Sequence, residues 1–101
     1  MKYESWIKEN FPTKESAFNR CNVATRAITA TFPELEVQVG YANGTLHCWA
    51  KAPDGSIVDP TALQLQKPIK YTLIANRFLK RHEFEPATGA VFLDDEAGGV
   101  V

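Results

Sequence analysis

Residues 46–59 read LHCWAKAPDGSIVD, and this stretch decides the fold. Two runs suited to β-strands flank the Pro-Asp-Gly of residues 53–55. That tripeptide is typical of a three-residue hairpin loop, in which Gly55 takes the left-handed position. The stretch therefore predicts antiparallel strands over about residues 46–52 and 56–59.

The length of the loop decides which side chains share a face, because side chains alternate along a strand. A three-residue loop places Trp49 opposite Asp59, so that His47 shares their face. Asp59 is then diagonal to His47, about 7–8 Å away at the backbone, a gap that an imidazole and a carboxylate can close. A two-residue loop would place His47 and Asp59 on opposite faces of the hairpin. The alternative interpretation is an ordinary hairpin, with a partly buried histidine and an aspartate that only starts a turn at Pro60.

Elements upstream of this hairpin extend the prediction to an α+β fold. Apolar spacing predicts a short amphipathic helix at about residues 3–9 and a second at about 16–31, which ends before Pro33. Residues 35–41 alternate apolar and polar, and Asn43-Gly44 is a strong hairpin turn signal. We expect N-terminal helices packed on a small, three-stranded antiparallel sheet.

The chain after Pro68 carries a weaker pattern. Residues 73–79 favour a helix, and a strand at 69–74 is the alternative. A small hairpin is expected within residues 84–93, and the acidic, Gly-rich residues 94–101 are expected to fray. We expect residues 1–101 to form a single domain.

Composition limits the classes of partner. The chain has 101 residues, 45% of them hydrophobic and 23% charged, as is ordinary for a globular protein. Its net charge of −1 gives no electrostatic reason to expect a nucleic-acid or membrane partner, and the sequence indicates no cofactor or metal. The N-terminal residues mix charged and apolar side chains, unlike a signal peptide, so we expect a cytoplasmic protein with two reduced cysteines. A Cys21–Cys48 disulfide is the alternative for a secreted protein, and the sequence does not indicate the oligomeric state.

An ordered set of short motifs runs through about residues 16–65. The matching positions are residues 21–30, 32–35, 40–41, 47–49, 54–55 and 57–62, together with Gln64. The set resembles the papain-like superfamily in its transglutaminase-like form, and most closely a group of small uncharacterised phage and bacterial proteins of that type.

The resemblance implies a catalytic triad. Cys21 would be the nucleophile, His47 its general base and acid, and Asp59 the group that fixes the imidazole tautomer. A helix N-terminus and an imidazolium can lower a thiol pKa by several units, which suits these roles. Members of the group carry Gly-Gln before the cysteine, whereas this chain has Asn19-Arg20. Asn19 is therefore the expected substitute oxyanion donor, beside the backbone N–H of Cys21.

Other residues have a functional and a structural interpretation. Trp49 and Tyr41 are candidates to wall the substrate cleft, but each can equally be a core aromatic. Cys21 on an apolar helix face is compatible with a small buried residue. Cys48 alternates away from His47 and is expected to pack in the core without a chemical role. No residue after Ala62 contributes to the functional prediction, and substrate contacts are expected from the N-terminal helix or the segment after Gln66.

Three functions compete. The first is a cysteine-nucleophile acyl-transfer enzyme, a protease, amidase or deamidase acting on a protein or peptide. The second is a non-catalytic protein-binding module on the same scaffold, such as a phage-encoded inhibitor of a host factor. The third is a metal site of Cys21, His47 and Asp59 with Cys48 or His82, which the spacing of these residues disfavours.

Overall fold

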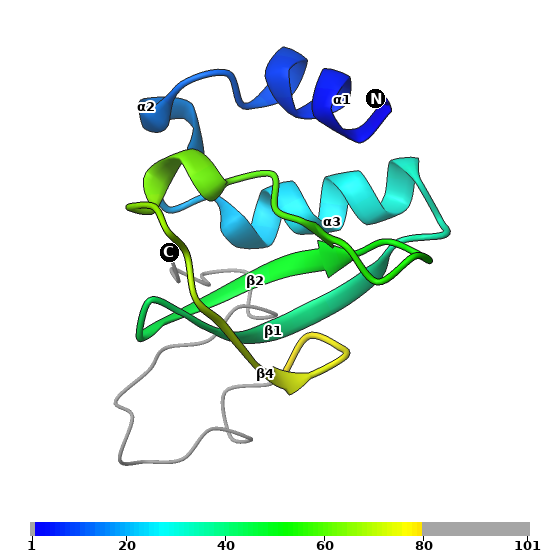
Figure 1. Cartoon of the computed structure of the whole chain (residues 1–101). Coiled ribbons are helices and arrows are strands. Elements are labelled where there is room, and N and C mark those ends of the chain that lie inside the picture. Colours follow the sequence, from blue (N-terminus) through cyan, green and yellow to red (C-terminus); the bar gives the residue numbers. More distant parts are fainter. Residues whose placement is uncertain (1, 80–101) are drawn as a thin grey trace.

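The computed structural model describes residues 2–79, which form an α+β domain (Figure 1). Three helices precede a four-stranded antiparallel sheet of order β3-β2-β1-β4. The elements are α1 (Lys2–Asn10), α2 (Lys14–Ala17), α3 (Cys21–Thr31), β1 (Glu36–Ala42), β2 (Thr45–Lys51), β3 (Ile57–Val58), the 3-10 helix η1 (Ala62–Gln64) and β4 (Tyr71–Ala75). Figure 1 shows α1 and α3 on one side of β1 and β2, so the predicted packing of helices on an antiparallel sheet is confirmed. No helix within residues 2–79 is long and apolar enough to cross a bilayer.

The two predicted turns set the register of the central strands. Asn43 and Gly44 both have positive φ, 52° and 80°, as a type I′ turn between β1 and β2 requires. Ala50 pairs with Val58 across β2 and β3. The loop closes through a 2.9 Å hydrogen bond from the Ala52 N–H to the Ser56 carbonyl. The predicted three-residue loop and its register are therefore correct, although β3 is shorter than expected.

The prediction of one helix over residues 16–31 is wrong, because the segment forms α2 and α3 with a turn between them. Thr13 caps α2 in a capping box with Ser16, each side chain accepting the other residue's backbone N–H at 3.0 Å. Phe18 is extended, and Asn19 has a φ of 57°, so the chain cannot continue as a helix. Helix α3 starts afresh at Cys21. The cysteine therefore lies at the head of a helix, as its predicted role required.

The favoured helix after Pro68 is also wrong, since Tyr71–Ala75 form β4, close to the alternative strand. This strand pairs with β1 and makes the sheet four-stranded. The edge of β1 carries backbone donors and acceptors that need hydrogen-bond partners, and a fourth strand provides them. Sequence periodicity does not show that this edge is unpaired. The pairing shifts register between Val39 and Gly40. The expected hairpin at 84–93, the expected fraying at 94–101 and His82 lie outside the described residues.

The core consists of two apolar clusters between the helices and the sheet. One holds Cys21, Val39, Leu46, Cys48 and Leu79; the other holds Ile28, Leu35, Ala50, Ala52 and Val58, covered by Tyr3, Trp6 and Ile7 of α1. Both clusters contain residues from one face of α3, because residues 21, 24, 25 and 28 of that helix are buried. This face presents Cys21 to the middle of β2.

Candidate active site

His47 and Asp59 form a buried hydrogen-bonded pair. The Nε2–H of His47 donates to Asp59 Oδ2 at 2.8 Å, and their side chains are 0% and 3% exposed. His47 lies on β2, and Asp59 directly follows β3. The predicted diagonal contact across the hairpin is thus present, and the loop length is its cause.

Three further donors surround the Asp59 carboxylate. Tyr71 donates its hydroxyl to Oδ2 at 2.8 Å. Thr61 donates its backbone N–H to Oδ1 at 3.0 Å and its hydroxyl to the same oxygen at 3.4 Å. Both carboxylate oxygens therefore have partners, which fixes the direction in which Asp59 presents Oδ2 to His47.

The contact of Tyr71 with Asp59 is not among the predictions, which use no residue after Ala62 for the triad. Tyr71 comes from β4, which pairs with β1, whereas Asp59 follows β3 at the other end of the sheet order. Only the fold brings these two residues together, since no short-range spacing links them. A strand at 69–74 was among the predicted alternatives, but nothing in it indicated a partner for the tyrosine.

Gln64 connects the aspartate loop to the segment before Cys21. Its Nε2 donates to Thr61 Oγ1 at 3.2 Å, and its Oε1 accepts the backbone N–H of Asn19 at 3.1 Å. Gln64 belongs to the motif set that carries the resemblance, but no sequence pattern indicates what it does there. In the structure it ties the turn that introduces α3 to the Asp59 loop.

Cys21 is the first residue of α3 and is 0% exposed. Hydrogen bonding with the Cys48 side chain lowers the pKa of Cys21, burial opposes this, and the hydrogen bond and charge of His47 lower it further, to about 6. Cys48 is buried, as expected, and its effect on the pKa of Cys21 is not among the predictions. Burial and the neighbouring Cys21 raise the pKa of Cys48 well above 9.0.

The pKa of His47 moves in the opposite direction to that of Cys21. Burial lowers it, but hydrogen bonds with Asp59 and Cys21 and the charges of both outweigh burial and raise it to about 10. Burial raises the pKa of Tyr71 too, and the charge of Asp59 and the hydrogen bond to it add to that effect, so the phenol stays neutral. Between pH 6 and 10 these shifts favour a thiolate at Cys21 beside an imidazolium at His47.

The remaining predicted site residues lie around this centre in different ways. Trp49 is 1% exposed and donates its indole N–H to Gln38 Oε1 at 3.0 Å. Its ring centroid is 4.8 Å from that of Tyr71 and 6.1 Å from that of His47. Trp49 therefore packs against His47 and Tyr71 in the interior and does not line an open cleft. Tyr41 is half-buried against the cluster that contains Cys21, and Asn19 is exposed.

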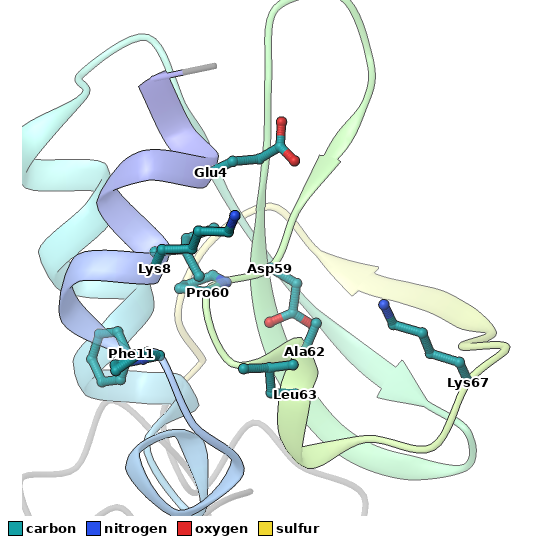
Figure 2. Close-up of a pocket in the computed structure, with 10 residues that line it drawn as sticks. Glu4, Lys8, Phe11, Asp59, Pro60, Ala62, Leu63 and Lys67 are labelled. Atoms are coloured by element: carbon teal, nitrogen blue, oxygen red, sulfur yellow. The ribbon is translucent and has the colours of Figure 1, made fainter.

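A cavity of about 450 Å³ opens beside the site, between α1 and the chain that follows β3. Figure 2 shows Glu4 and Lys8 on the helix side, and Asp59, Pro60 and Leu63 across from them. Asp59 is the only one of the three triad candidates among the lining residues. Within residues 2–79 no group of three or more His, Cys, Asp or Glu residues is arranged to hold a metal ion.

Comparisons with known proteins add no relative. No family model matches the chain, and searches of curated proteins and of solved structures find no significant match. The geometry and electrostatics of the site are therefore the support for a function.

Proposed function

We propose that this protein is a cysteine-nucleophile acyl-transfer enzyme of the papain-like, transglutaminase-like type. It would act as a protease, amidase or deamidase on a protein or peptide. The observation that carries the proposal is the buried His47–Asp59 hydrogen bond beside a cysteine whose pKa is lowered. Nucleophile, base and orienting carboxylate are the three parts that thiol acyl transfer needs.

Each residue has a defined role in the proposed reaction. The Cys21 thiolate attacks an acyl or amide carbon, and the resulting tetrahedral anion collapses to a thioester. His47 gives its proton to the departing amine, then takes one from water or an acceptor amine that attacks the thioester. Because Asp59 occupies Nε2 of the ring, Nδ1 is the nitrogen that serves Cys21. Asp59 stabilises the imidazolium through that bond.

Hydrogen bonds to Asp59 and around Gln64 support these roles. Tyr71 and Thr61 hold Asp59 in place, and Gln64 holds the turn before Cys21 to the same loop. An orienting carboxylate acts only if its own rotamer is fixed, and these donors provide that restraint. Asn19 and the backbone N–H of Cys21 are the proposed oxyanion donors.

Substrate entry requires a local opening. Cys21 and His47 are both 0% exposed, and Leu79 is buried in the same apolar cluster as the thiol. An acyl group would reach Cys21 by displacing part of this apolar cover. We propose that the protein works in the cytoplasm, where both cysteines, free in the structure, would stay reduced.

The ionisation of Cys21 is the first test, because it can be read without a substrate and without access to the thiol. Thiolate ultraviolet absorbance of the folded protein should rise with a midpoint near pH 6, as the Cys21 pKa requires. His47→Ala should move that midpoint up, and Cys21→Ser should abolish the transition. A midpoint near 9 in wild type would refute the activated thiolate.

Reactivity is the second test. Alkylation of wild type by iodoacetamide should be roughly tenfold faster at pH 8 than at pH 5, since the thiolate fraction changes by that factor for a pKa near 6. A thiol with an ordinary pKa would show a ratio of roughly a thousand. Cys48 in the same molecule is the internal control, since its pKa is raised. Labelling of Cys21 no faster than that of Cys48 would count against an enzyme.

A non-catalytic binding module is the second candidate function. The complete burial of Cys21 and His47, and a neighbouring cavity reached only by Asp59 of the three, favour it. In that case alanine at all three positions would leave binding to a protein partner intact. Loss of turnover in Cys21→Ser with retained folding would instead favour the enzyme.

A further inference from the structure

Cys21 and Cys48 lie side by side between α3 and β2. Both are free, 0% exposed and members of one apolar cluster. The Sγ of Cys48 lies 3.6 Å from Thr25 Oγ1. Thr25 is four residues after Cys21 and therefore lies one turn along the same helix face. Each thiol also shifts the pKa of the other, lowering that of Cys21 and raising that of Cys48.

We infer that Cys21 and Cys48 form a reversible thiol–disulfide pair that a small peroxide oxidises, with Cys21 as the attacking thiol and Cys48 as the resolving thiol. The inference goes beyond the proposed acyl transfer and does not depend on it. Its basis is the contact between the chain's two cysteines, one from a helix N-terminus and one from the adjacent strand.

The proposed chemistry has two steps. The Cys21 thiolate attacks one oxygen of hydrogen peroxide, the O–O bond breaks, and the departing hydroxide takes a proton from His47 to form water. This leaves a sulfenic acid on Cys21. Cys48 then attacks that sulfur, the S–O bond breaks, and hydroxide leaves as water with the Cys48 proton. Two thiols lose two electrons, and the peroxide is reduced to two waters.

The environments of the two thiols suit these different roles. His47 adjoins Cys21, and the Cys21 pKa is lowered, so this thiol carries the thiolate that attacks peroxide. Cys48 has a raised pKa and stays protonated until the sulfenic acid forms beside it. Both thiols are buried, and hydrogen peroxide, which is small and neutral, needs a smaller opening to reach them than a bulky disulfide does. Redox-sensitive cysteines combine a low pKa, access to the oxidant and an adjacent resolving cysteine; here access requires a local opening above Cys21.

A disulfide at this position would inactivate the proposed enzyme, because its nucleophile, Cys21, would no longer be a free thiol. It would also link the head of α3 to β2. Reduction by a small dithiol would restore both free thiols.

The test is peptide mass spectrometry of native wild-type protein after exposure to hydrogen peroxide. We expect a Cys21–Cys48 cross-linked peptide, a loss of two hydrogen atoms, and full reversal by dithiothreitol. Peptide mapping separates this change from oxidation of the single methionine. Cys48→Ser should instead accumulate a Cys21 sulfenic acid that dimedone traps, and Cys21→Ser should give neither product.

The outcomes distinguish this inference from the proposed function. Sulfenic or higher oxidation of Cys21 in wild type without a cross-link would overturn the pairing, as would disulfides only between two chains. No oxidation at all would overturn it too. A cross-link in a protein that shows no thiol acyl transfer would keep the redox pair and reject only the enzyme. Since wild type alone decides the matter, failure of a variant to fold leaves the test intact.

Discussion

Replacing Cys21 by serine should change how stability depends on pH, and the change follows from two opposing pKa shifts. In the folded protein the pKa of His47 is raised from 6.5 to about 10, and that of Cys21 is lowered from 9.0 to about 6. Folding of wild type therefore moves a proton from the thiol to the imidazole at neutral pH. The number of bound protons stays the same.

Each group alone would make the free energy of unfolding change with pH. A raised histidine pKa contributes stability that is fully present below 6.5 and is lost as pH rises through the folded pKa, about 10. A lowered thiol pKa contributes stability that is present above 9.0 and is lost as pH falls through about 6. Between about pH 6.5 and 9 the two slopes cancel. In this range the wild-type pair should therefore leave the free energy of unfolding nearly independent of pH.

Cys21→Ser removes the pH dependence contributed by the thiol and keeps that contributed by His47. His47 is still bonded to Asp59 in this variant, so its pKa stays raised, though by less than in wild type. One proton corresponds to about 1.4 kcal/mol per pH unit. From pH 7 to 9 the variant should therefore lose about 2 kcal/mol relative to wild type.

Urea unfolding at a series of pH values, followed by tryptophan fluorescence, measures this difference. Trp49 is almost fully buried and reports loss of the site directly. Ile28→Val is the matched control, because it loses a buried methylene of α3 without a titratable group. It should lower the free energy of unfolding by about 1 kcal/mol at every pH. If the Cys21→Ser and wild-type curves run parallel between pH 7 and 9, no thiolate–imidazolium pair exists and the reasoning fails.

Three further substitutions test how the site is held, each by urea unfolding. Tyr71→Phe should cost about 2 kcal/mol, because it removes a hydrogen bond to the Asp59 carboxylate. Gly40→Ala should cost about 3 kcal/mol, because the new Cβ overlaps the backbone carbonyl oxygen of Thr72 and must displace β4. Thr13→Ala should cost about 1 kcal/mol, because α2 loses its capping box.

Each of these has a control of the same chemical type. Tyr41→Phe removes a hydroxyl without touching Asp59 and should cost clearly less than Tyr71→Phe. Gly44→Ala meets no atom within 4 Å and should cost only about 1 kcal/mol for its positive φ. Thr31→Ala lies at the end of α3 and should be near neutral. Equal costs within any pair would contradict the structural reason given for it.

Local sequence signals predicted the hairpins well and the helix boundaries less well. The turns at residues 43–44 and 53–55 depend on backbone preferences of a few adjacent residues, so the register could be counted from them. The break between α2 and α3 depends on Asn19 adopting a positive φ, which its neighbours alone do not dictate. The fourth strand depends on the open edge of β1, a property of the assembled sheet.

The sequence by itself determined the contact between His47 and Asp59, because loop length and strand alternation fix which residues share a face. It also placed Cys21 on a helix, but the start of that helix at Cys21 depends on the break at Asn19. Tertiary structure alone decided that Tyr71 reaches Asp59 and that Cys48 lies against Cys21. These contacts join segments that no turn or periodicity connects, and they form only when α3 packs on the sheet and β4 pairs with β1. The burial that shifts the pKa values of Cys21 and His47 has the same origin.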